Sequence, residues 1–176
     1  GITITDTPPE FLEFFSSMIA MDDPRHARLR RIVSKGFTPR MLATLEDSVQ
    51  RIASSIVDAI AEKGECDFVT EVAAALPLKI VCDLMGVPDS AYEMVFKNTN
   101  IILGVGDPEF APEDVDFVTA LLNAGAELAE LMKEVAEAKK GGDGTDLTSV
   151  LVNAEIEGDH LDEADLASFF VLLVVA

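Results

Sequence analysis

Apolar residues recur at intervals of three and four along almost the whole chain, and this period constrains the fold more than any other feature. At 3.6 residues per helical turn, such spacing gathers the apolar side chains on one face of each segment, which must then be buried. The longest segment, residues 112–140, has an almost heptad stripe that a coiled coil would also show. We therefore expect a mainly α fold in which helices pack on helices.

Residues that typically start or end helices divide the apolar pattern into separate helical segments. Asp22 or Asp23 is expected to cap the first helix, whose first turn holds Pro24. A strand is expected at residues 65–69, ECDFV, and a tight hairpin around Gly158. The expected helices cover residues 24–36, 39–63, 69–85, 89–103 and 112–140, a short segment ending at Val152, and a final segment capped by Asp162.

The chain is expected to be one domain that is itself incomplete. Its 176 residues are 49% hydrophobic, with no internal repeat and no linker, so residues 1–176 have no internal boundary. It begins at Gly1 without an initiator Met, signal peptide or transit segment. Residues 166–176, LASFFVLLVVA, are too short to span a bilayer and too apolar to be solvated, which indicates the first half of a buried helix.

Charge and cysteine content exclude several classes of function. The formal net charge of −19 repels phosphate, which argues against nucleic acid or an anionic membrane as a partner. Cys66 and Cys82 have neither the spacing of metal ligands nor that of a disulfide framework. We therefore expect no metal site built from this chain's residues, and the two thiols suit a reducing compartment.

One segment of the chain is basic, whereas the chain as a whole is acidic. Within residues 22–40, DDPRHARLRRIVSKGFTPR, six of the chain's 13 Lys and Arg residues lie in sixteen positions, with no acidic residue from 24 to 45. On a helix, His26 and Arg30 fall within about 60° of the apolar Val33 and Phe37, so we expect them to point inward. Such a pair needs an anion, either an acidic residue of this chain or a bound carboxylate ligand, and the spacing leaves both open.

A second strip lies about opposite on the same helix. It consists of Arg28, Arg31 and Lys35. A strip of this kind is usually a solvated face. Because its sign opposes that of the whole chain, it would also suit an acidic protein partner.

Residues 22–40 resemble the C helix of bacterial cytochromes P-450, the haem-thiolate monooxygenases, in the pattern D-x-x-x-H-x-x-x-R followed by Phe-Thr-Pro. Three further segments resemble the family in its own order: PLKIVCDLMGVP the E helix and its exit, ILGVGDPEF the F–G loop, and SFFVLLVVA the first half of the I helix. The resemblance covers essentially the whole chain, from the B–C loop to the middle of the I helix. The chain is most similar to actinobacterial enzymes that oxidise methyl-branched lipids at the chain end, with terpene-alcohol hydroxylases as neighbours.

This resemblance implies roles for individual residues. It assigns His26 and Arg30 to the haem propionates, and Arg28, Arg31 and Lys35 to the surface that receives electrons from an acidic ferredoxin. By the same resemblance, an apolar set lines the substrate pocket, although any one member could equally be an ordinary core residue. This set comprises Phe15, Met18, Ile19, Leu103, Val175 and Ala176.

The catalytic parts of the family are missing from these 176 residues. The family's axial Cys lies in a Phe-x-x-Gly-x-x-x-Cys-x-Gly loop, which does not occur here, and neither Cys66 nor Cys82 matches it. The acid and Thr of the I helix would follow Ala176. The chain alone is therefore expected neither to hold haem tightly nor to catalyse.

The resemblance implies a cytoplasmic haem monooxygenase that hydroxylates a methyl-branched fatty acid, sterol or isoprenoid lipid with O2. Its electrons would come from NAD(P)H through a ferredoxin reductase and a ferredoxin. Two other classes remain as alternatives: a non-catalytic helical domain in which His26 and Arg30 pair internally, and a nucleic-acid-binding protein. The net charge and the lack of aromatic residues among the basic positions, apart from Phe37, argue against the second.

Overall fold

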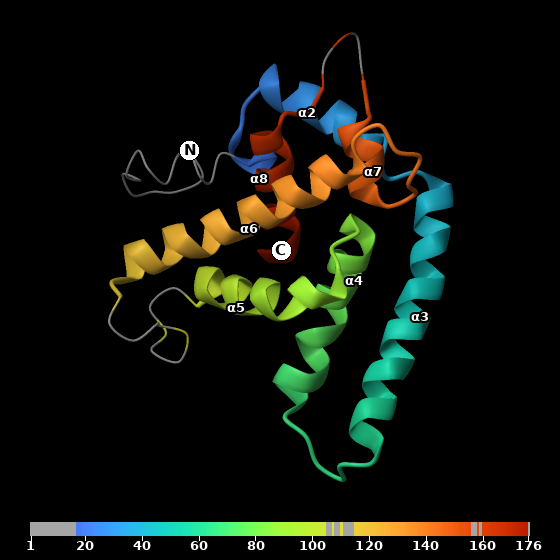
Figure 1. Cartoon of the computed structure of the whole chain (residues 1–176), viewed down its shortest axis with the longest axis vertical. Helices are drawn as coiled ribbons and strands as arrows, with labels where there is room; N and C mark the ends of the chain where they lie inside the picture. Colours follow the sequence, from blue (N-terminus) through green and yellow to red (C-terminus); the bar gives the residue numbers. More distant parts are fainter. Residues whose placement is uncertain are drawn as a thin grey trace.

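The computed structural model of the chain describes residues 17–104, 107, 110, 115–155, 158 and 160–175. Within these residues the secondary structure is helical, and two long helices, α3 and α6, form the largest pieces (Figure 1). The elements are η1 (Met18–Ala20), α2 (Arg25–Ser34), α3 (Pro39–Ala61), η2 (Val69–Ala73), α4 (Ala75–Met85), η3 (Asp89–Ala91), α5 (Tyr92–Leu103), α6 (Phe117–Lys139), α7 (Leu147–Val152) and α8 (Glu163–Val175).

The helices pack around α8, which lies behind α6 in Figure 1 and contacts α4, α5, α6 and α7. Phe170 and Leu166 of α8 are buried in the same core as Leu128 and Met132 of α6. α5 packs along α6, and α3 runs beside α4 at the edge of the molecule. A smaller apolar cluster joins α3 to α4 and contains Ile52, Ile56 and Ala75.

Side-chain caps explain where most of the helices start. Asp23 Oδ1 accepts a hydrogen bond from the Ala27 N–H at the start of α2, at 3.1 Å. Asp162 Oδ1 does the same for the Asp165 N–H in α8, at 2.7 Å, which confirms the cap expected there. The caps of α3, α6 and α7 are Thr38, Asp116 and Asp146.

The strand expected at residues 65–69 is wrong. Residues 65–67 have no regular structure, and Asp67 Oδ1 instead accepts from the Thr70 N–H at 2.9 Å, so that a helical turn begins. A lone strand leaves its backbone N–H and C=O groups without ladder partners, and no partner strand occurs in the described parts of the chain. Phe68 and Val69 are consequently exposed, at 65% and 69%.

Two helix boundaries also differ from expectation. The helix expected over 69–85 is divided into a π-helical turn, η2, and α4. The long helix starts at Phe117 because Asp116 caps it, and Pro112 lies outside the described residues. Gly158 does adopt a turn conformation with φ 85°, but the arms of the expected hairpin include residues 156, 157 and 159, which are not described.

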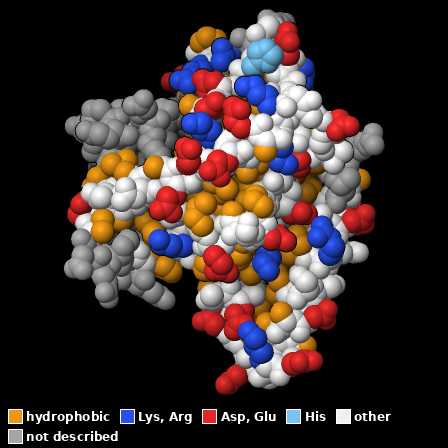
Figure 2. Space-filling view, in the orientation of Figure 1, with side chains coloured by type: hydrophobic (Ala, Val, Ile, Leu, Met, Phe, Trp, Pro, Cys, Tyr) orange, Lys and Arg blue, Asp and Glu red, His pale blue; other side chains and the backbone are white. Residues whose placement is uncertain are grey.

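The visible face of the molecule carries both acidic and basic side chains (Figure 2). Figure 2 shows Asp and Glu side chains spread over the visible face, with Lys and Arg placed among them. None of the described helices is both long enough and apolar enough to cross a bilayer.

Candidate functional site

The basic helix α2 buries one face and exposes the rest. Leu29, Ile32 and Val33 form its buried face, and Gly36, just beyond it, lies so close to α7 that a Cβ would stand 2.2 Å from Leu147 Cδ1. The ring of Phe37 meets the ring of Phe169 in α8 edge to face, with the centroids 6.5 Å apart. These contacts fix the back of α2 on α7 and α8.

The expected inward direction of His26 and Arg30 is only partly correct. His26 is half-buried, with its side chain 35% exposed and Nδ1 3.7 Å from Asp23 Oδ1. Arg30 is exposed, because the buried face is centred about 100° around the helix from it. Within the described residues the guanidinium of Arg30 has no hydrogen-bond or ion-pair partner, so the internal Arg30 ion pair is not seen there.

These two side chains are suited to a carboxylate ligand. They lie one turn apart on the same edge of α2, and an unpartnered guanidinium beside an imidazole can donate several hydrogen bonds to anionic oxygens. The donor set therefore fits the two propionates of a haem. It does not include the axial thiolate, since Cys82 is buried in α4 and Cys66 lies in the α3–η2 connection.

Arg28, Arg31 and Lys35 lie on the exposed side of α2, as expected. Lys35 is not simply solvated: its Nζ donates a hydrogen bond to the backbone carbonyl of Glu155, at 2.6 Å. That bond joins the end of α2 to the segment that follows α7. Sequence reasoning missed this contact because nothing in the local pattern relates residues 120 positions apart.

Two of the expected substrate residues meet at one cavity. A cavity of about 300 Å³ lies between α4, α5 and the end of α8, and both Leu103 and Val175 line it. Its other lining residues are Ala74, Pro77, Leu78, Val81, Phe96, Thr99, Asn100, Leu173 and Val174. The lining is mainly apolar, which suits the hydrocarbon part of a lipid.

Of the remaining four residues, the two that the structure describes do not reach this cavity. Met18 packs against the main core from η1, and Ile19 beside it is 64% exposed. Neither lines the α4–α5–α8 cavity. Phe15 and Ala176 lie outside the described residues.

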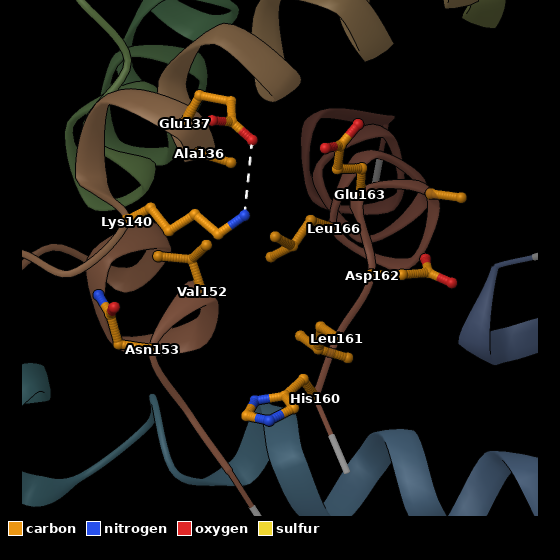
Figure 3. Close-up of a pocket in the computed structure, with 11 residues that line it drawn as sticks. Ala136, Glu137, Lys140, Val152, Asn153, His160, Leu161, Asp162, Glu163 and Leu166 are labelled. Carbon is orange, nitrogen blue, oxygen red and sulfur yellow. Dashed lines mark ion pairs between the residues drawn. The ribbon is translucent and has the colours of Figure 1, made fainter.

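A larger groove, of about 770 Å³, lies elsewhere, between α6, α7 and the start of α8 (Figure 3). Lys140 reaches toward Glu137 there, with Nζ 3.7 Å from Oε1, and Leu161 and Leu166 line the groove across from them. None of the haem, substrate or redox-partner candidates from the sequence lines this groove. We therefore assign it no part in the chemistry.

Cys82 is not placed as a reactive thiol, and the described acidic side chains form no metal site. Burial, together with the nearby charge of Asp89, raises the pKa of the Cys82 thiol to about 11, so this thiol stays protonated at neutral pH. Among the described residues, no group of three or more His, Cys, Asp and Glu side chains is placed to hold a metal ion.

Asp165, which sequence reasoning missed, is the one charged residue that is buried among those described. Its Oδ1 lies 3.6 Å from Arg25 Nη2, so it connects the first turn of α8 to the first turn of α2. Burial and the Asp162 carboxylate raise the pKa of Asp165, while Arg25 and Arg28 act in the opposite direction.

We compared the sequence and this arrangement of helices with known proteins. No family model matches the chain. The methyl-branched lipid omega-hydroxylase of Mycobacterium tuberculosis is 44% identical over 179 residues, which cover 100% of this chain and 41% of the relative. A steroid C26-monooxygenase of Mycolicibacterium smegmatis is 35% identical over 159 residues, 90% of this chain and 36% of the relative. The chain thus spans about two fifths of the length of the curated relatives it matches.

Solved structures of cytochromes P450 superpose on almost the whole of this chain. A cytochrome P450 of Mycobacterium marinum in complex with pseudoionone superposes with a TM-score of 0.88 and 37% identity, over 99% of this chain and 42% of that chain. CYP109E1 of Bacillus megaterium in complex with testosterone gives a TM-score of 0.77 and 28% identity, over 92% and 42% of the two chains.

The fold is therefore an all-helical part of the cytochrome P450 fold. In sequence and in structure the chain corresponds, over its whole length, to about two fifths of a bacterial cytochrome P450, and mycobacterial methyl-branched lipid omega-hydroxylases are among its relatives.

Proposed function

We propose that the protein containing this chain is a cytoplasmic haem-thiolate monooxygenase that hydroxylates a methyl-branched fatty acid, sterol or isoprenoid lipid. The observation that carries this proposal is the 44% identity to the methyl-branched lipid omega-hydroxylases over the whole chain. When bound, the haem would supply activation of O2, so that one oxygen atom enters a C–H bond and the other leaves as water after uptake of two electrons and two protons.

This chain's contribution would be to hold the haem edge and the substrate. His26 and Arg30 would donate hydrogen bonds to the two propionates from one edge of α2. The cavity lined by Leu103 and Val175 would hold the substrate's hydrocarbon part and keep water away from it. Phe15, Met18, Ile19 and Ala176 are proposed to line the same substrate path.

The exposed strip of Arg28, Arg31 and Lys35 is proposed to face the electron donor. Its positive charge on a chain of net charge −19 supports a local contact with an acidic ferredoxin, which a ferredoxin reductase would supply with electrons from NAD(P)H. Such contacts govern mainly the rate of association and its dependence on salt.

The names of the relatives indicate which lipids are candidate substrates. The curated relatives are named for methyl-branched lipids and for carbon 26 of steroids, and the M. marinum structure contains pseudoionone. A hydroxylase of terpene alcohols of the same family is the second candidate, and the isoprenoid carbon skeleton of pseudoionone, a ketone, supports it for the hydrocarbon part of such a substrate. Incubating the reconstituted full-length enzyme with a methyl-branched fatty acid, a sterol and a terpene alcohol, followed by mass spectrometry of the products, distinguishes them.

The proposal is tested first by spectroscopy of the full-length protein. A strongly red-shifted Soret band after reduction and addition of carbon monoxide is expected, because it marks haem bound through a Cys thiolate. Absence of haem would instead favour the non-catalytic helical domain. The 176-residue chain alone is expected to give no such band. Its two cysteines, the buried Cys82 and the exposed Cys66, do not match the loop that holds the family's axial Cys.

A further inference from the structure

Asp165 is buried where a carboxylate needs a compensating charge. Its side chain is 6% exposed, and its position in the first turn of α8 already uses the Asp162 side chain as the cap of its own N–H. Burying a carboxylate without a compensating charge is strongly unfavourable. Among the described residues, the cation nearest to it that forms an ion pair is Arg25, whose guanidinium remains 59% exposed.

This ion pair acts on the part of α2 that has the least packing. The buried residues of α2 are Leu29, Ile32 and Val33, all beyond its first turn. The first turn itself is held by backbone hydrogen bonds to Asp22 and Pro24, by the bond from the Ala27 N–H to the Asp23 side chain, and by the contact between Arg25 and Asp165. Together with the buried face formed by Leu29, Ile32 and Val33, the pair therefore restrains the position of this turn and its rotation about the helix axis.

His26 and Arg30 depend on that rotation. Adjacent residues in a helix project about 100° apart, so fixing Arg25 toward α8 directs His26 to the neighbouring edge of α2, and Arg30 lies one turn further on the same edge. His26 itself is 35% exposed, and its ion-pair partner is the exposed Asp23, at 3.7 Å.

We propose that Asp165 is a positioning residue for the haem-propionate contacts: through Arg25 it orients the first turn of α2, and thereby His26 and Arg30. This inference rests on the proposed haem-binding function. It adds a residue of α8 that would act on the haem without contacting it.

The test uses the full-length holoenzyme and three variants. Asp165→Asn removes the charge at nearly constant volume, Arg25→Gln removes the other partner, and the third variant combines both. Haem transfer to an excess of apomyoglobin measures the rate of haem loss, and a redox titration measures the haem potential. We expect each single variant to lose haem about 3–10-fold faster and to shift the potential, because hydrogen bonds to a charged carboxylate weaken when their donors are less well oriented.

The double variant distinguishes a shared contact between Arg25 and Asp165 from a general loss of stability. If Arg25 and Asp165 act through one contact, the double variant is expected to lose haem no faster than either single variant. A control, Asp146→Asn, breaks the ion pair with Lys139, whose Nζ lies 2.7 Å from Asp146 Oδ2, on the α6–α7 side. It is expected to lower the thermal midpoint without changing the haem-loss rate or the potential.

Three outcomes would overturn the inference. They are wild-type haem loss in Asp165→Asn, equal acceleration in Asp146→Asn, and strictly additive effects of the two single variants. If Asp165→Asn does not fold, Arg25→Gln still decides, because its exposed side chain is replaceable without a cavity. A full-length protein that holds no haem overturns the proposed function and this inference together, whereas a haem-replete protein with unresponsive variants overturns this inference alone.

Discussion

Lys35 and Glu155, 120 positions apart, are joined by a hydrogen bond from Lys35 Nζ to the backbone carbonyl oxygen of Glu155 at 2.6 Å. This bond connects the end of α2 to the segment between α7 and α8. A residue on the surface proposed for electron transfer is therefore also a structural contact.

Lys35→Ala is expected to reduce the free energy of unfolding by about 0.5–1.5 kcal/mol, because a net hydrogen bond is lost at a largely exposed site. Urea unfolding of the full-length protein, followed by circular dichroism, measures this change. A matched substitution, Lys133→Ala, removes an exposed lysine of α6 and should leave stability within about 0.5 kcal/mol. Equal stability in both variants would contradict the structural role of Lys35.

Arg30→Ala and Arg28→Ala are expected to separate haem binding from electron transfer. Arg30 lies on the edge of α2 that it shares with His26, whereas Arg28 lies on the exposed strip. Arg30→Ala should accelerate haem loss, and Arg28→Ala should mainly slow ferredoxin-dependent turnover, most clearly at low ionic strength. Equal haem loss in both variants would show that the two faces of α2 are wrongly assigned.

Gly86→Ala is expected to destabilise the protein by about 2–4 kcal/mol, through a strained backbone and a steric clash together. Gly86 ends α4 with φ 67°, and a Cβ there would stand 2.4 Å from Lys139 Nζ and 2.8 Å from Asp146 Cγ. Gly64→Ala is the control, since Gly64 has φ 76° but nothing within 4 Å of its Cβ position. Thermal unfolding of both variants isolates the clash, and equal losses would argue against it.

The two thiols are expected to react at very different rates. Cys66 is exposed, whereas Cys82 is buried and the pKa of its thiol is raised to about 11. A chromogenic disulfide reagent at pH 8 should therefore modify Cys66 quickly and Cys82 only after unfolding. Mass spectrometry of the labelled peptides identifies each site, and rapid labelling of Cys82 in the folded protein would contradict the packing of α4.

The contribution of Asp165 to the free energy of unfolding should fall as the pH rises from 3.8 through the raised pKa of this residue. Burial, followed by the Asp162 charge, raises the pKa of Asp165 above 3.8, so the folded state binds a proton more tightly than the unfolded state. Its contribution is most favourable below 3.8 and declines as the pH passes through the raised pKa. Urea unfolding of wild type and Asp165→Asn at several pH values from about 3.5 to about 7.5 should show that the stability of the wild type relative to the variant declines as the pH rises.

Local sequence determined the helices. Their periods and the caps at Thr38, Asp116, Asp146 and Asp162 depend on residues within a few positions of each other, and most of the expected helices are confirmed. The family was also recognisable from short segments such as residues 22–40 and 166–176, because each motif consists of residues that are close together in the chain.

Tertiary structure decided which faces are buried and which distant residues meet. The strand expected at 65–69 had the right composition but no partner among the described residues, and Arg30 is exposed because α7 and α8 take the neighbouring face of α2. Leu103 meets Val175 at one cavity, and Arg25 meets Asp165, across separations that no local pattern encodes. Helix formation depends on neighbours along the chain, whereas a site depends on how the helices are packed.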